Sequence, residues 1–347
     1  MTITMYQRFA VFALALAAVI FTCCATLCAS EKSEFPPYIP FAISIEGVAV
    51  DKTGNVYVSV RDVDAGRIWK FAPDGQGTPF ATIGTGVSMV GGLALDAEGN
   101  LFVAVAEGPD RGVYSIDRRG DSARLPGTEQ IAFANALAFD QRGNLYVTES
   151  YSGSAPSYGP GGIWRIPSKT KTAELWQRDA LFTGLGYVLG YPVGANGIAI
   201  YHGDLYVVNT DKGIVVRVSI SADGNPGIPE VWAPLQEVPE SPMAGSPFPL
   251  MGDGLALDVH GNVFVAVISR SAIVRINASD KSQETVSFLP IKPLDCPASL
   301  AFGTGTGEQQ NLFVTNLGWM SVIVPGRPWP GPGLVMIDAG VPGLPLP

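Results

Sequence analysis

From Phe41 onward, short apolar segments alternate with polar turns that contain Gly and Asn. In one unit, an apolar run that begins at Gly254 leads into the turn Val-His-Gly-Asn, and a second apolar run begins at Val263. The apolar runs predict strands. Gly-Asn predicts a tight turn, because these residues adopt backbone conformations that others resist. The pattern therefore indicates two antiparallel strands joined by a short turn.

This unit occurs six times in all, and a third apolar segment follows in every copy. The copies begin at Glu46, Gly91, Asn135, Asn196, Asp253 and Ala298. A period of roughly 45 to 60 residues with about four strands per unit is typical of a β-propeller. The prediction is an all-β fold in which residues 31–347 form one six-bladed propeller, with about four antiparallel strands per blade and no helix of convincing length.

The Gly- and Pro-rich connections 150–161, 178–195 and 225–252 are expected to be loops on the face where the first strands begin, and they are candidate lids. Glu149 ends a second strand on that face, so it is a candidate substrate contact, with a solvated strand end as the alternative. The Pro-rich tail 341–347 is expected to lie along the surface.

The first thirty residues differ from the rest. Arg8 precedes an apolar run from Phe9 to Leu27, and small residues follow. This order predicts a signal peptide over residues 1–30 and a secreted or periplasmic protein; the alternative is a membrane anchor through residues 9–28. Three of the four cysteines would be removed with the signal peptide, which leaves Cys296 alone. The sequence therefore predicts neither an intrachain disulfide nor a cysteine metal site.

The net charge of the chain argues against some classes of partner. The formal net charge is -9, with no basic stripe, which argues against a nucleic-acid partner. After signal cleavage no membrane partner is expected, and a small-molecule substrate is the expected partner.

In a propeller the first strand of each blade lines the central channel, so the six residues that begin the copies should surround its mouth. We call these six the channel ring. Two carboxylates and two carboxamides among them form a ligand set that suits Ca²⁺, whereas Zn²⁺ is disfavoured without His or Cys. The alternative is that these residues cap turns or strands, but capping would not require the same offset in four blades. The predicted metal ligands are Glu46, Asn135, Asn196 and Asp253.

Other recurring polar residues point to structure rather than chemistry. Asp51, Asp96, Asp140 and Asp258 precede turn asparagines in blades with and without a polar ring residue. The two histidines, His202 and His260, fall in turns on the opposite face, and no Gly-x-Ser-x-Gly motif occurs. A hydrolase of this sequence would therefore have to be metal-based.

The chain resembles the senescence-marker protein (regucalcin)/gluconolactonase family over nearly all of residues 41–343. The resemblance is carried by Glu46-Gly, Asn135 ahead of Phe139-Asp140, Asn196-Gly, Asp253-Gly-Leu and Leu300-Ala-Phe-Gly. It implies a six-bladed propeller with one divalent metal ion, most often calcium, held by Glu46, Asn196 and Asp253. It further implies that Asn135 contacts metal or substrate and that Asp253 is the general base.

Substrate recognition departs from that family. Phe133 and Ala136 stand where sugar-lactone members often have Arg and Asp, and Gly91 stands where paraoxonase relatives have His. Phe133, with Tyr187 and Tyr191, indicates a more apolar mouth. The leading prediction is a secreted, calcium-dependent hydrolase of a lactone or related cyclic ester. The alternatives are a non-catalytic propeller with a structural calcium ion and a strictosidine-synthase-like propeller.

Overall fold

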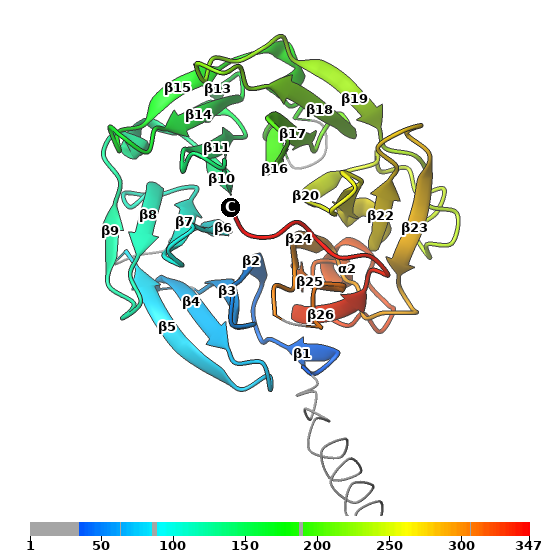
Figure 1. The fold of residues 1–347 in the computed structure, drawn as a ribbon. Helices are drawn as coiled ribbons and strands as arrows, with labels where there is room; N and C mark the ends of the chain where they lie inside the picture. The colour runs from blue at the N-terminus through cyan, green and yellow to red at the C-terminus, as the bar shows by residue number, and fades with distance from the viewer. Residues whose placement is uncertain (1–34, 63, 85–88, 187–189, 306) are drawn as a thin grey trace, which may run out of the picture. The chain divides into compact units, whose positions relative to one another are not determined.

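In the computed structural model, six antiparallel sheets of four strands surround a central channel (Figure 1). It describes residues 35–62, 64–84, 89–186, 190–305 and 307–347. The predicted signal peptide and Tyr187 lie outside these residues. Within them, no helix is long and apolar enough to cross a membrane. The all-β, six-bladed prediction is confirmed.

Each blade runs from an inner strand at the channel to an outer strand at the rim. Blade 1 contains β2 (Ile45–Val50), β3 (Val56–Arg61), β4 (Gly66–Phe71) and β5 (Gly77–Ile83); blade 2 contains β6 (Val90–Leu95), β7 (Leu101–Val105), β8 (Gly112–Ile116) and β9 (Ser122–Arg124). Blade 3 contains β10 (Ala134–Phe139), β11 (Leu145–Glu149), β14 (Gly162–Ile166) and β15 (Glu174–Gln177); blade 4 contains β16 (Ala195–Tyr201), β17 (Asp204–Asn209), β18 (Ile214–Ser219) and β19 (Glu230–Pro234). Blade 5 contains β20 (Gly252–Leu257), β21 (Val263–Val267), β22 (Ala272–Ile276) and β23 (Gln283–Phe288); blade 6 contains β24 (Pro297–Phe302), β25 (Asn311–Asn316), β26 (Gly333–Asp338) and β1 (Tyr38–Pro40).

Short elements connect these strands. They are the hairpin of β12 (Ser152–Ser154) and β13 (Ser157–Gly159), the 3-10 turns Thr128–Gln130, Ala180–Phe182 and Ile268–Arg270, and the one-turn helix α2 (Met320–Ile323).

The repeated aspartates build the inner turns, as expected from their position. Asp258 Oδ1 accepts hydrogen bonds from the backbone N–H groups of His260 and Asn262, and Oδ2 accepts one from the Asn262 side chain. Asp140 engages Asn144 in the same way. These carboxylates hold turns at the far end of the inner strands.

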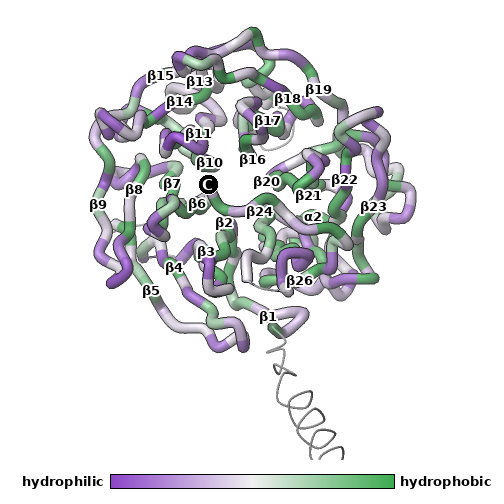
Figure 2. The backbone as a smooth tube through the Cα atoms, in the orientation of Figure 1, coloured by the Kyte–Doolittle hydropathy of each residue, from purple (hydrophilic) through white to green (hydrophobic). Residues whose placement is uncertain are grey.

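The hydrophobic core consists of layers between neighbouring blades. Val208, Val215 and Trp232 of blade 4, for example, pack with Leu255, Val265 and Val274 of blade 5. Hydrophobic positions follow the strands, and hydrophilic ones gather at the outer turns (Figure 2). A sheet buried on both faces explains why most middle strands are apolar without alternation.

Every inner strand carries a register shift at its channel-ring residue, as between Ala195 and Ile198 or between Gly252 and Leu255. A bulge of this kind bends the strand and re-aims a side chain. The residue after the ring position must also be small. A Cβ on Gly197 would lie 2.4 Å from the Asp253 carbonyl oxygen, and one on Gly254 would lie 2.5 Å from that of Ala298.

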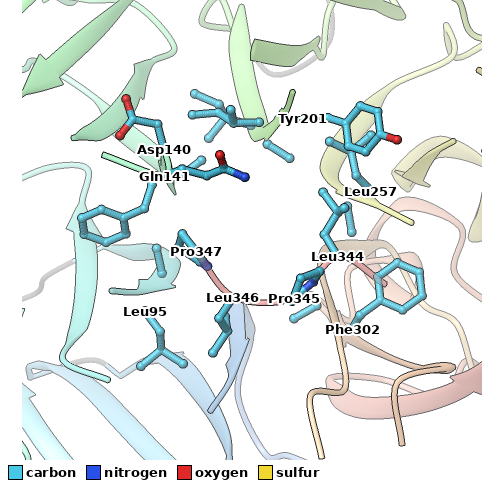
Figure 3. A pocket seen from close by; sticks show the side chains of 18 of the residues that line it. Leu95, Asp140, Gln141, Tyr201, Leu257, Phe302, Leu344, Pro345, Leu346 and Pro347 are labelled. Carbon is cyan, nitrogen blue, oxygen red and sulfur yellow. The ribbon is translucent and has the colours of Figure 1, made fainter. Parts of the chain in front are cut away.

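Two expectations are corrected. Two connections are not all loop: 150–161 contains the hairpin of β12 and β13, and 225–252 contains β19 as the outer strand of blade 4. The tail does not lie along the outer surface. Leu344 donates its backbone N–H to Leu257, and the segment to Pro347 crosses the far end of the channel (Figure 3). Leu344 and Leu346 pack against the core layers beside the inner strands, which accounts for this course.

Blade 6 closes the propeller with strands from distant parts of the sequence. Tyr38 to Pro40 pair with Gly333 to Val335, so β1 is the outer strand of this sheet. The Tyr38 hydroxyl adds hydrogen bonds to the carbonyl oxygens of Pro330 and Pro332.

Candidate functional site

The structure brings the four polar residues of the channel ring together. Their side chains line one cavity of about 60 Å³ at the channel mouth, and each is at most 9% exposed. Gly92 and Ala298 line the same cavity and leave space. The volume exceeds the roughly 10–15 Å³ that one water needs, so an ion and a few waters fit, whereas a substrate would lie above the ring.

A second set of six residues stands beside the ring, one per blade, at the end of the second strand or directly after it. The backbone N–H of each donates to the residue two positions before its ring residue, so all six share one register. We call these the partner positions: Arg61, Ala106, Ser150, Thr210, Ile268 and Leu317.

In blades 3 and 4 the partner is a hydroxyl that orients a ring amide. Asn135 Nδ2 donates to Ser150 Oγ at 3.0 Å, and Asn196 Nδ2 donates to Thr210 Oγ1 at 3.0 Å. Ser150 Oγ itself donates to the Ala195 carbonyl, so it can only accept from Asn135. Since the amide nitrogen faces the hydroxyl, the amide oxygen of Asn135 is left for the cavity.

In blade 1 the partner is a cation. Arg61 Nη2 lies 2.5 Å from Glu46 Oε2, and the side chains are 21% and 8% exposed, respectively. The Thr315 hydroxyl of blade 6 donates to the Glu46 backbone carbonyl, which ties the two blades together. One ring carboxylate therefore already has a counter-charge.

In blade 5 the partner is Ile268, so Asp253 receives no polar contact from the partner position of its own blade. Burial raises the pKa of Asp253 well above its usual value, and the charge of Glu46 raises it further. Arg61 and a hydrogen bond from Asn196 act in the opposite direction. Asp253 is thus the ring carboxylate whose negative charge is least compensated.

This donor set fits a hard divalent cation. Two carboxylates and two amide oxygens offer the oxygen ligands that Ca²⁺ takes. Among the described residues no group of three or more His, Cys, Asp or Glu side chains could hold a metal ion, so amides are needed to complete the set. The uncompensated charge of Asp253 favours a cation in the cavity.

Phe133 and Tyr191 lie in an aromatic cluster beside the ring. The Phe133 ring is 4.7 Å from that of Tyr151 and 6.4 Å from that of Tyr191, between centroids. Phe133 is buried under the cluster, whereas Tyr191 is half-buried. Burial chiefly raises the pKa of Tyr191, and the charges of Arg61, Glu46 and Asp253 also act on it, so its hydroxyl lies within electrostatic reach of the ring.

Glu149 faces into the protein. Its side chain is 1% exposed, and it accepts hydrogen bonds from the Ala132 backbone, the Trp164 indole and Arg178. Asn209 and Asn316 are, like Glu149, the last residues of the second strands of their blades. Each donates a side-chain hydrogen bond to a backbone carbonyl of the loop that leads into the inner strand. Both oxygens are engaged within the protein, so Glu149 is not the solvated strand end given as the alternative. The substrate contact of Glu149 stays a prediction.

Sequence reasoning missed the residue that fixes the loop bearing Tyr191. Asp211 Oδ2 accepts the backbone N–H groups of Leu185, Gly186 and Val193, at 2.8 to 3.0 Å. It also missed the partner positions. An alignment of the second-strand ends would have shown hydroxyls only in the two blades whose ring residue is Asn.

A larger cavity, about 500 Å³, opens at the opposite end of the channel. Apolar strand ends and the segment Leu344–Pro347 line it (Figure 3). Asp140 is the one Asp or Glu side chain among its lining residues and is engaged in a turn, and Arg142 and His202 line the cavity as well.

A comparison with known families matches residues 123–318 to the family described as SMP-30/Gluconolactonase/LRE-like region. A putative hetero-Diels-Alderase, asR5, from Sarocladium schorii is 32% identical over 233 residues. That match covers 57% of this chain and 54% of the relative, so the chain spans about half the length of the curated relative.

Solved structures share the fold. A gluconolactonase from Xanthomonas campestris is 16% identical with a TM-score of 0.62, covering 91% of this chain and 93% of its own. A calcium-binding regucalcin from Agrobacterium tumefaciens is 17% identical with a TM-score of 0.62, covering 90% of this chain and 97% of its own.

Proposed function

This chain belongs to the SMP-30/gluconolactonase/LRE-like family, and from that premise we propose that it hydrolyses a lactone or related cyclic ester with a calcium ion at the channel ring. The observation that carries the proposal is the convergence of four oxygen-donor side chains on one buried cavity, in one register of four blades. Among them Asp253 has the least compensated charge.

In this proposal the ring residues bind the ion, and one of them also accepts a proton. Glu46, Asn135, Asn196 and Asp253 would hold the ion, which supplies a positive charge that polarises the lactone carbonyl. Asp253 would accept a proton from the attacking water. The oxygen of that water adds to the carbonyl carbon, the ring C–O bond breaks, and the released alkoxide takes up a proton. The product is a hydroxy acid.

A panel of lactones of different ring sizes, assayed with calcium and with a chelator, tests this function. Turnover that requires calcium is the expected result, and the preferred ring size would narrow the substrate. Turnover unaffected by complete metal removal would contradict the proposal. A calcium effect on stability without turnover of any lactone would favour the non-catalytic propeller.

Calcium is expected to stabilise the fold. At a calcium concentration one hundred times the dissociation constant, linkage gives about 2.7 kcal/mol, which a thermal melt with and without chelator would detect. Protons compete for Asp253, whose pKa is raised, so the calcium-dependent shift should grow as the pH rises. A shift that is absent, or that shrinks with rising pH, would contradict the ring as the calcium site.

A second candidate function has its own support. The relative that is 32% identical is a putative hetero-Diels-Alderase, and the aromatic cluster of Phe133, Tyr151 and Tyr191 suits an apolar substrate. A cycloaddition forms its bonds without adding water and needs no general base. The Asp253→Asn variant would keep such an activity but lose lactone hydrolysis.

We also propose that residues 1–30 act as a signal peptide and that the protein is secreted or periplasmic. Support comes from the order of Arg8, the apolar run and the small residues. Sequencing the amino terminus of protein recovered outside the cytoplasm tests cleavage near residue 30; an uncleaved, membrane-bound chain would contradict it.

A further inference from the structure

We infer that Arg61 gives this site a preference for substrates that carry a negative charge, a carboxylate above all; the inference deepens the proposed function and rests on it. Arg61 occupies in blade 1 the partner position that Ser150 and Thr210 occupy in blades 3 and 4. Those hydroxyls only orient ring amides, whereas an arginine there brings a permanent positive charge to the channel mouth.

The guanidinium has capacity left for a ligand. Of its N–H groups, the hydrogen bonds to described residues use one, that from Nη2 to Glu46, and the buried Nε has no partner among those residues. Its central carbon lies 6.0 Å from the centroid of the Trp319 ring. Trp319 is itself fixed, because its indole N–H donates to Ser44 Oγ. The cation is therefore held in place with donors unused.

Charge balance sets the sign of the ligand. Glu46, Asp253 and Arg61 together carry one net negative charge when both carboxylates are ionised. A divalent cation changes this to one net positive charge, in a cavity largely removed from water where charges interact strongly. A single anionic group on the substrate would restore neutrality. Exposed Glu107 is also near the mouth, but it is solvated and accepts a hydrogen bond from the Tyr151 hydroxyl.

The surroundings define the rest of the ligand. Half-buried Tyr191 is within electrostatic reach of both Arg61 and the ring carboxylates. A substrate above the ring would thus meet an aromatic surface and the guanidinium at once. The class that satisfies both is a lactone with an apolar or aromatic body and a carboxylate substituent.

Binding of two lactam probes to the full chain tests the inference without turnover. One probe is a five-membered lactam bearing a carboxyphenyl group, and the other is its methyl ester; both resist hydrolysis. Calorimetry with saturating calcium should show the acid binding about tenfold or more tighter than the ester, the range of a hydrogen bond to a charged group. Arg61→Met should remove that preference, and Arg61→Lys should restore part of it.

Arg217→Met is the matched control, because Arg217 is half-buried on the third strand of blade 4, away from the ring, and pairs with Glu230; it should keep the preference. Equal affinity of the acid and the ester for the wild type overturns the inference, as does a preference that survives in Arg61→Met. Binding of neither probe at millimolar concentration overturns it too. Lactone turnover without acid preference would leave the proposed function standing, whereas an Arg61-dependent preference without turnover of any lactone would remove only the hydrolase.

Discussion

Replacing Asp253 with Asn is expected to lower lactone turnover by about 10²- to 10⁴-fold, the range of a positioned general base. The amide is nearly the same size, so it fills the same place among Glu46 and Asn196, but it accepts no proton and brings no charge to the ion. The variant should also bind calcium more weakly. Steady-state kinetics and calorimetric calcium titration measure the two effects separately.

Asp96→Asn is the matched control. Asp96 is a carboxylate at the far end of an inner strand, where it accepts hydrogen bonds from the Asn100 backbone and side chain. Its loss should cost stability at the scale of a hydrogen bond, about 0.5–1.5 kcal/mol, and leave kcat unchanged. Full turnover by Asp253→Asn would contradict the hydrolytic role of the ring and favour a cycloaddition.

Glu149→Ala is expected to lower the free energy of unfolding by about 1–3 kcal/mol, the cost of leaving a buried hydrogen-bond donor without its acceptor. The substitution leaves the Trp164 indole and the Ala132 N–H without their acceptor, whereas Arg178 is 30% exposed and keeps the Pro160 carbonyl. Denaturant titration measures the loss, and the folded fraction should keep the wild-type KM.

Glu174→Ala provides the comparison, since Glu174 is 49% exposed and pairs with Arg165 at the rim. An exposed pair contributes about 0–1 kcal/mol, so this variant should be close to the wild type. A Glu149→Ala protein of unchanged stability whose KM has risen would instead show that Glu149 contacts substrate.

The fold was predictable because each blade repeats its own local pattern. Gly-Asn turns, apolar strands and the spacing of their copies are encoded within roughly 50 residues, so six comparisons support every assignment. The inner strands and the channel ring follow from that repetition. Even Ser150 and Thr210 follow a repeat position, and comparing the second-strand ends would have found them.

Other features depend on contacts that no repeat encodes. Glu149 looks like a strand end near the mouth, yet Arg178 and Trp164 come from other segments to engage it. The tail is Pro-rich like a surface segment, but Leu344 and Leu346 find apolar space beside the channel. For Glu149 the outcome depends on neighbouring segments of its own blade, whereas for the tail it depends on apolar space between blades.

The closure of blade 6 has a consequence for how the protein is made. Sheets of blades 1 to 5 use strands that are consecutive in sequence, apart from the inserted hairpin, so each can form as the ribosome delivers it. Blade 6 joins Tyr38 to Val335, and its tyrosine hydroxyl reaches a carbonyl 292 residues away. Such non-local pairing is slow. During synthesis β1 therefore stays unpaired until β26 emerges. An unpaired strand can associate with another nascent chain.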